Sequence, residues 1–298
     1  MTVATTTATA AGDHDDDDDD AMAGILKEAC LLVRARTKGM AGTARGSKEM
    51  GRTGAGGDVS RKIDLAAEKA VMEVLRKHKV GATVIGEECG VISNEGSGFV
   101  VVDGIDGTTN AVRRVPFYCC SLAYATGPRL SAVTDAAIID LVTGDLYHAS
   151  RRRGAFCNGR RIRTRKSTES MVMGINLSKI DERAARRLAP VIARSEHTRQ
   201  LGATALEMCY VASGRLDAFI DVRGKARITD IAAACLIVEE AGGVVCSPSA
   251  GDDDGSALDA DLDIKTRVSL IAAGSKKIFR RLWPAKRGGS TKHYGAQP

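Results

Sequence analysis

The chain has 298 residues, of which 44% are hydrophobic and 27% are charged, the composition of an ordinary soluble globular protein. This length allows one large domain or two coupled halves. No apolar run reaches the roughly 18 residues of a membrane span, and the N-terminus lacks a basic segment followed by an apolar one. We therefore expect a cytoplasmic protein with no signal peptide and no membrane partner.

The formal net charge of +6 hides a strongly basic body. Seven aspartates, at positions 13 and 15–20, stand in one short tract, and without them the net charge rises to +13. A basic body favours anionic ligands such as phosphate esters or nucleic acid. Aromatic residues, on which unpaired bases stack, make up only 4% of the chain, and no recognised nucleic-acid motif is present, so nucleic acid is the less favoured partner.

The first part of the chain alternates between helical and strand patterns. Residues 1–21 have no apolar periodicity, so we expect a disordered acidic tail. Apolar residues at helical spacing, short apolar runs and a cluster of glycines predict the elements that follow. In order, these are a helix over 22–37, a glycine-rich loop over 51–57, a helix over 61–79, and buried strands over 82–86 and 99–102.

Between residues 119 and 162, turn residues such as Asn158-Gly159 separate apolar runs and predict several antiparallel strands. Beyond residue 170, strand and helix patterns alternate again. They predict a strand from 171, helices over 182–194 and 203–213, a strand over 218–221, a helix over 230–241, and strands over 244–246 and 269–273. This alternation predicts a layered α/β sandwich of two coupled halves, 22–150 and 151–284, with a loose tail over 285–298.

Carboxylates stand at the ends of predicted strands or at a predicted helix start in three segments. The segments are Gly86-Glu87-Glu88, Asp103 to Thr108, and Thr229-Asp230. Side chains from separate elements can converge on one cleft at such positions, and Mg²⁺ is usually held by carboxylates together with substrate phosphate and water. Asp103, the backbone carbonyl of Ile105 and Asp106 can all face one point as the chain turns off its strand.

Gly107 and Thr108 open a short segment that can begin a helix. Gly107 allows a close approach of the backbone to a ligand, and N–H groups at a helix start bind phosphate oxygens. The simpler interpretation is that these aspartates and threonines build an Asx turn and cap a helix. Taken alone, each of the three segments leaves both interpretations open.

Together and in this order, the segments are specific. The chain resembles the inositol monophosphatase superfamily, including its bifunctional fructose-1,6-bisphosphatase/inositol monophosphatases of archaeal type, over residues 23–280. The matching words are Val84-Ile85-Gly86-Glu87-Glu88, Val102-Asp103-Gly104-Ile105-Asp106-Gly107-Thr108-Thr109-Asn110, and Thr229-Asp230-Ile231-Ala232-Ala233-Ala234 with Glu240-Ala241-Gly242-Gly243.

This resemblance implies an α/β/α/β/α sandwich, Mg²⁺ dependence, lithium sensitivity and a homodimer. The metal ligands that it implies are Glu87, Asp103, Asp106, Asp230 and the carbonyl of Ile105. Two Mg²⁺ ions would neutralise these carboxylates, an incoming phosphate would favour a third ion, and Mn²⁺ is an expected substitute.

The same resemblance implies a route for the reaction. Asp64 would hydrogen-bond Thr108, and Glu87 with Thr108 would position a metal-activated water for in-line attack on phosphorus. The catalytic residues are therefore expected to be Glu87, Thr108 and Asp64. The implied substrate neighbours are Asp106, Gly107, Thr108, Arg199 and Thr204.

Some positions depart from the family pattern. Gly104 stands where the family usually has proline, and Thr229 stands where dedicated inositol monophosphatases commonly have tryptophan. The stretch 221–227 is basic, and Arg223 within it is predicted to pair with a second phosphate. Gly104 adds backbone freedom and removes no ligand. Thr229 and the basic stretch favour the archaeal bifunctional type, and Arg223 suits a bisphosphate substrate.

The sequence therefore predicts a phosphoric monoester hydrolase of carbohydrate metabolism, acting on fructose 1,6-bisphosphate, as in gluconeogenesis, on inositol 1-phosphate, or on both. A 3'-phosphoadenosine-5'-phosphate phosphatase is the alternative within the same class. The alternatives from other classes are a non-catalytic phosphate-ligand protein and a nucleic-acid-binding protein. Retention of every implied ligand argues against the former.

Overall fold

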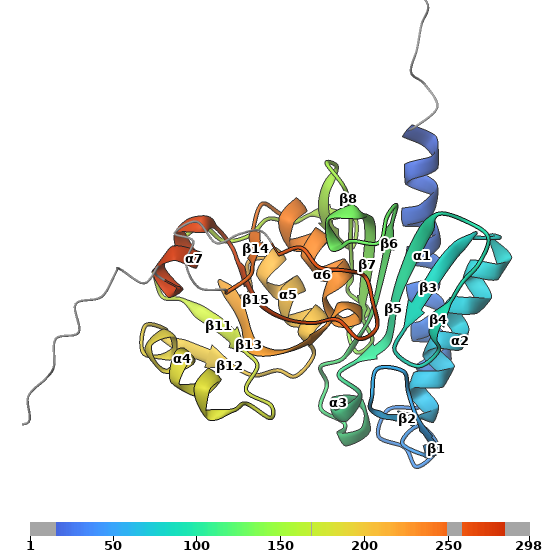
Figure 1. Ribbon diagram of the computed structural model, residues 1–298, viewed down its shortest axis with the longest axis horizontal. Coiled ribbons are helices and arrows are strands. Elements are labelled where there is room, and N and C mark those ends of the chain that lie inside the picture. Colours follow the sequence, from blue (N-terminus) through green and yellow to red (C-terminus); the bar gives the residue numbers. More distant parts are fainter. Residues whose placement is uncertain (1–15, 168, 249–257, 284–298) are drawn as a thin grey trace, which may run out of the picture.

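A computed structural model describes residues 16–167, 169–248 and 258–283. The predicted N-terminal tail up to residue 15 and the predicted C-terminal tail lie outside these residues. The described chain forms five layers: a helix pair on each outer side, two sheets, and a third helix pair between the sheets (Figure 1). The predicted α/β/α/β/α sandwich is confirmed.

The first sheet contains eight strands in the order β10-β9-β8-β7-β6-β5-β3-β4. Neighbouring strands are antiparallel except for β3 and β5, which run parallel. Helices cover both faces of its centre, so the central strands are apolar along most of their length instead of alternating. Its strands are β3 (Ala82–Gly86), β4 (Gly90–Ile92), β5 (Gly98–Asp106), β6 (Cys119–Ala125), β7 (Val133–Asp140), β8 (Leu146–Ser150), β9 (Gly154–Cys157) and β10 (Arg160–Arg161).

This sheet continues past the predicted division near residue 150. β9 pairs with β8, with Ser150 opposite Gly154, and β10 pairs with β9 at the sheet edge. The strands on both sides of residue 150 therefore belong to one antiparallel meander, and the last strand of the first sheet ends at Arg161.

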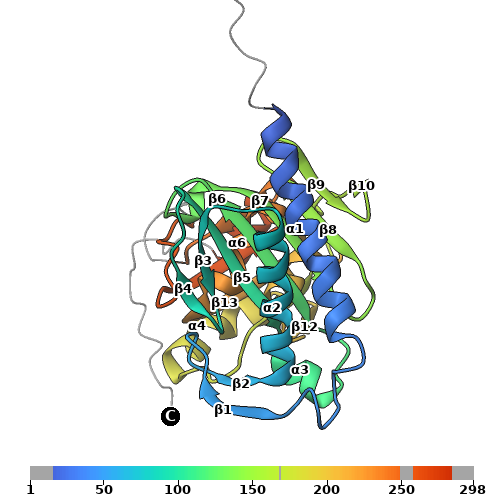
Figure 2. The ribbon, with the colours of Figure 1, turned by 90° about the vertical axis from the view of Figure 1, so that its right-hand side faces the viewer.

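Two helices, α1 (Asp16–Thr37) and α2 (Lys62–Lys77), cover the outer face of this sheet (Figure 2). Their apolar stripes, which include Leu26 and Val71, form one core with the sheet. The backbone of α1 begins at Asp16 instead of residue 22, so part of the acidic tract predicted as a tail is helical. Acidic residues favour the first turns of a helix, and apolar periodicity carries no signal for them.

The glycine-rich segment predicted as a loop is a small hairpin. β1 (Glu49–Thr53) pairs antiparallel with β2 (Val59–Arg61). The turn between them is held by hydrogen bonds from Gly54 N to Asp58 O, at 2.9 Å, and from Gly57 N to Gly54 O, at 3.0 Å. This turn lies against the backbone that follows β3, because Gly56 N donates to Glu87 O at 2.9 Å.

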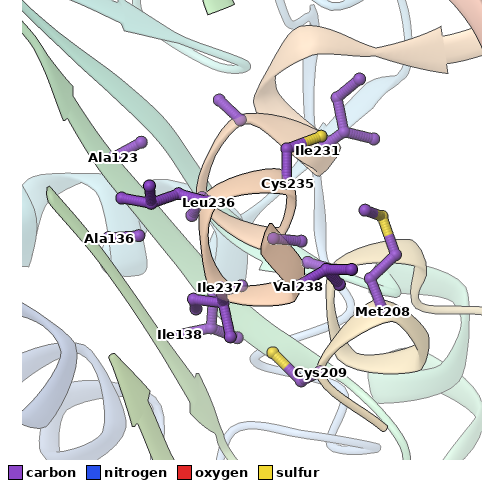
Figure 3. Packing of buried hydrophobic residues seen from close by; sticks show 14 of the residues in the cluster. Ala123, Ala136, Ile138, Met208, Cys209, Ile231, Cys235, Leu236, Ile237 and Val238 are labelled. Carbon is purple, nitrogen blue, oxygen red and sulfur yellow. The ribbon is translucent and has the colours of Figure 1, made fainter. Parts of the chain in front are cut away.

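Helices α5 (Thr204–Ala212) and α6 (Ile228–Glu240) lie between the two sheets. Both are apolar on nearly all sides, as a helix buried between two layers must be. In Figure 3, Leu236 of α6 points toward Ala123 and Ala136 of the first sheet. This central core fixes where the first turns of α5 and α6 meet the strand ends.

The second sheet has five strands in the order β12-β11-β13-β15-β14, and its outer face is covered by α4 and α7. β11 runs parallel to β12 and β13, whereas β15 runs antiparallel to β13 and β14. The remaining elements are β11 (Val172–Ile175), α4 (Glu182–Ile192), β12 (His197–Arg199), β13 (Ala218–Arg227), β14 (Val244–Cys246), β15 (Arg267–Ala273), α7 (Lys276–Leu282), the short helix α3 (Thr108–Arg113) and a 3-10 turn over Leu130–Ala132. Among the described residues, no helix combines the length and apolar character needed to cross a bilayer.

The central core predicts a large difference between two leucine-to-alanine variants. Leu236 is 1% exposed and Leu31, on α1, is 53% exposed. We expect Leu236→Ala to lower the free energy of unfolding by about 2–5 kcal/mol, because it leaves a cavity between the sheets. Leu31→Ala should change it by less than about 0.5 kcal/mol. Urea unfolding followed by circular dichroism measures both, and equal losses would contradict this packing.

Candidate active site

Three carboxylates converge where β3, β5 and α6 meet. One oxygen from each of Glu87, Asp103 and Asp230 lies within 4.8 Å of an oxygen from each of the others. Glu87 follows β3 and Asp103 lies on β5, and these strands are adjacent and parallel, with Gly86 opposite Val102. Asp230 comes from the first turn of α6, which packs on β5. The sequence predicted these three residues as ligands, and the fold brings them together.

β5 carries a bulge that aims the two aspartates of the loop in one direction. Asp103 pairs with Ser121 and Asp106 with Cys119, so three steps on β5 face two on β6. Residues three apart on a regular strand point to opposite faces, and the extra residue removes this difference. Gly104 and Ile105 both face the α2 side, where a Cβ on Gly104 would stand 2.9 Å from Ala67 Cβ. The strand therefore continues to Asp106 and does not end at residue 102.

Asp106 faces the central helix layer but is not one of the three grouped carboxylates. Its Oδ2 accepts a hydrogen bond from Ala205 N at 2.6 Å, in the first turn of α5. Thr204, predicted to contact substrate, is the first residue of α5 and is buried beside this carboxylate. Asp106 thus ties the bulge to α5, and its role as a metal ligand stays a prediction.

The predicted pairing of Asp64 with Thr108 is present. Thr108 Oγ1 lies 3.1 Å from Asp64 Oδ1 and 3.0 Å from the carbonyl oxygen of Ile105. Asp64 Oδ2 also accepts from Arg61 N at 3.0 Å, which fixes the carboxylate at the first turn of α2. Gly107 precedes Thr108 with φ of 91°, in the left-handed region that favours glycine, and it caps α3.

Burial and mutual repulsion raise the pKa values of these acids. Burial raises the pKa of Glu87 to about 8 although Arg227 opposes the shift, and burial raises the pKa of Asp64 to about 7. The pKa of Asp103 is raised well above its ordinary range by burial and then by the charges of Glu87 and Asp106. When the grouped carboxylates of Glu87, Asp103 and Asp230 are ionised, they therefore need positive charge nearby. The ligand atoms that they offer are all oxygens, as a hard cation such as Mg²⁺ requires. The residues fit the metal that the resemblance implies.

Arg227 is the functional-site residue that the sequence did not single out. It is the last residue of β13 and the residue before α6, and its guanidinium pairs with Glu87 through Nη1 and with Asp58 through Nη2. Its spacing, three residues before Asp230, was the available signal. A side chain at the start of a helix can reach the same cleft as the residue in its first turn.

The two arginines predicted to contact substrate are hydrogen-bonded to protein groups in the structure. Arg223 Nε and Nη2 pair with the fully buried Asp221, at 2.9 and 2.6 Å, and Nη1 donates to Ser178 O at 2.6 Å. Its guanidinium is thus already used inside the protein, at a shift in register between Asp221 and Ala226 on β13. Arg199 is exposed on the edge strand β12 and donates to Thr198 O. Substrate contact by either arginine stays a prediction.

The chain is similar to known phosphatases over most of its length. The model of the inositol monophosphatase family matches residues 20–286. A fructose-1,6-bisphosphatase/inositol-1-monophosphatase of Methanothermobacter thermautotrophicus is 40% identical over 252 residues, which cover 78% of this chain and 85% of that protein. A bifunctional NADP phosphatase/NAD kinase of Methanococcus maripaludis is 30% identical over 272 residues, which cover 80% of this chain and 46% of that protein.

A solved structure has a similar overall fold. It is a hypothetical protein of Pyrococcus horikoshii with similarities to inositol-1 monophosphatase, with 26% identity and a TM-score of 0.73. The comparison covers 87% of this chain and 96% of that one. Since the family match spans most of the sequence and includes all three grouped carboxylates, the chain belongs to the inositol monophosphatase family.

Proposed function

We propose that the protein is a Mg²⁺-dependent phosphomonoesterase that hydrolyses fructose 1,6-bisphosphate, inositol 1-phosphate or both by in-line attack of water. The observation that carries this proposal is the convergence of Glu87, Asp103 and Asp230 from three separate elements. A capped turn, the simpler interpretation of the sequence, does not require three acids that are distant in the chain to share one place. The names of relatives such as the Methanothermobacter enzyme support the reaction class.

Glu87, Asp103 and Asp230 would hold Mg²⁺, with the Ile105 carbonyl and Asp106 as further expected donors. Bound Mg²⁺ supplies the positive charge that makes water a nucleophile near neutral pH and that offsets charge on the phosphate. The expected occupancy of two or three ions follows from the number of carboxylates, and Mn²⁺ is the expected substitute. Lithium sensitivity, a cytoplasmic location and a homodimer belong to the same proposal.

Thr108 and Asp64 would orient the attacking water. The Thr108 hydroxyl has one proton and two acceptors, Asp64 Oδ1 and the Ile105 carbonyl oxygen. The Ile105 carbonyl is an expected donor to the metal, so the hydroxyl would donate to Asp64, and its lone pairs would be left to accept from a water. Asp64 cannot swing away because Arg61 N holds its second oxygen. The pair therefore sets the direction in which the water presents its lone pair.

The substrate assignment rests on the relatives and not on Arg223, because that guanidinium is paired with Asp221. The Methanococcus relative named NADP phosphatase favours a second candidate, a nucleotide carrying a phosphomonoester. The predicted alternative, 3'-phosphoadenosine 5'-phosphate, belongs to the same chemical class. A panel of esters separates the sugar, cyclitol and nucleotide substrates.

Phosphate release from fructose 1,6-bisphosphate, inositol 1-phosphate, NADP and 3'-phosphoadenosine 5'-phosphate should require Mg²⁺ and stop in EDTA. Asp103→Asn should lower kcat/KM at least about 100-fold, because even residues that only support a metal ligand typically contribute 10- to 100-fold. Turnover that persists in EDTA, or a variant as active as the wild type, would rule out the proposed mechanism.

Thermal unfolding in EDTA provides the control for Asp103→Asn. The asparagine keeps an oxygen that can accept from Ile105 N, now 2.9 Å from Asp103 Oδ1, and it removes one of several crowded charges. The variant should therefore unfold at a temperature no lower than the wild type in EDTA, and it should gain less stability from Mg²⁺.

Thr108→Val tests the water-orienting pair. It keeps the shape of the side chain and removes the hydroxyl, so kcat should fall about 10²- to 10⁴-fold while Mg²⁺ affinity changes little. Thr108→Ser should retain most activity. The neighbouring Thr109 is exposed, and Thr109→Val is the matched control that should behave as wild type. Equal rates for the two valine variants would exclude this role for Thr108.

A further inference from the structure

A guanidinium lies among the carboxylates proposed to hold metal. Arg227 pairs with Glu87 on one side and with Asp58 on the other. The Glu87 side chain is 13% exposed and the Arg227 side chain 20%, whereas the Asp58 side chain is 61% exposed. The contact with Glu87 is thus largely shielded from water, and the contact with Asp58 lies at the surface.

The position of Arg227 is fixed by its surroundings. It precedes α6 by one residue, so it is anchored by the same helix start that presents Asp230. Gly56 lies against the pair, because a Cβ there would meet Glu87 Cγ at 2.7 Å and Arg227 Nη1 at 3.2 Å. The turn between β1 and β2 is held in turn by Arg267, whose Nη2 donates to Gly56 O at 3.1 Å. A side chain larger than glycine would therefore disturb the contact.

The shielded contact competes electrostatically with a metal ion. Arginine is charged at every accessible pH, so it supplies one positive charge to the group permanently. A cation that approaches Glu87 meets this charge at short range, where water screens it poorly. While Arg227 is bonded to one Glu87 oxygen, that carboxylate attracts a second cation less strongly. Asp58 offers the guanidinium a carboxylate to keep if the contact with Glu87 opens.

We propose that Arg227 is a built-in counter-cation of the site, which holds Glu87 when no metal is bound and releases it, while remaining on Asp58, when Mg²⁺ binds. The inference rests on the proposed function, because it takes Glu87 as a metal ligand. Its consequence is that Arg227 stabilises the metal-free protein and weakens its affinity for Mg²⁺. Arg227 acts through Glu87 and is therefore a positioning residue.

Calorimetric titration of the full chain with Mg²⁺, without substrate, tests the inference. Arg227→Met should bind Mg²⁺ at least about tenfold more tightly than the wild type, because a close like charge has been removed. In EDTA the same variant should unfold several degrees lower, since Glu87 loses its partner. Affinity that is unchanged or weaker would overturn the inference, and a weaker affinity would show that Arg227 helps to bind the metal.

Asp58→Asn distinguishes exchange of partners from a general effect of charge. Without Asp58, Glu87 is the remaining carboxylate bonded to the Arg227 guanidinium among the described residues, so Mg²⁺ affinity should fall several-fold. If Asp58 acts through Arg227, the double variant with Arg227→Met should bind as tightly as Arg227→Met alone. A double variant that lies midway between the single variants would mean that the two charges act independently, which contradicts the exchange.

Two further variants serve as controls for the charge of Arg227. Arg227→Lys keeps the charge and should stay within about threefold of wild-type affinity, although one ammonium cannot bridge both acids as a guanidinium does. Arg186→Met removes an arginine that pairs with Glu182 at the surface of α4, where both side chains are 79% exposed, so it should leave Mg²⁺ affinity unchanged. Absence of Mg²⁺ and Mn²⁺ binding in the wild type would refute the proposed function itself, whereas wild-type binding that Arg227→Met does not alter would refute only the inference.

Discussion

Crowding of negative charge inside the protein is the constraint on which the arrangement of the chain around the site depends. Glu87, Asp103 and Asp230 are brought within a few ångströms of one another, and Asp106 lies close enough to raise the pKa of Asp103. Such a group is unfavourable when ionised and dry unless cations or hydrogen-bond donors surround it. The fold supplies donors from helix starts and a guanidinium from β13, and the remaining negative charge is what a metal ion would neutralise.

The layered architecture explains why these donors are available. Both central helices begin beside the end of β5, so the positive ends of their dipoles are directed toward the acids. Asp106 accepts from the first turn of α5, and Asp230 belongs to the first turn of α6. The bulge between Asp103 and Asp106 is necessary for this arrangement, because a regular strand would turn one of the two aspartates toward α2.

Much of this could be predicted from the sequence because the signals were local. Apolar periodicity identified the helices over 61–79 and 230–241 to within two residues of their observed ends, since these helices bury one stripe or all of their surface. The sequence motifs around Glu87, Asp103 and Asp230 identified the grouped acids. Local sequence signals failed where the pairing of strands decides the structure. The hairpin around Gly54 and the membership of β9 and β10 in the first sheet depend on distant partners that local periodicity does not reveal.

The choice between arginines shows why a basic stretch in sequence does not identify the cation of a site. Arg223 and Arg227 lie on one strand, four residues apart. Side chains alternate between the two faces of a regular strand, so a regular strand would place both arginines on the same face. The register shift after Asp221 breaks this equivalence, so Arg223 pairs with Asp221 while Arg227 reaches Glu87. A phosphate arriving at the carboxylates would therefore meet Arg227 and not Arg223 as the nearest arginine of this strand. Contact between Arg223 and a second phosphate would consequently have to compete with its pairing to Asp221.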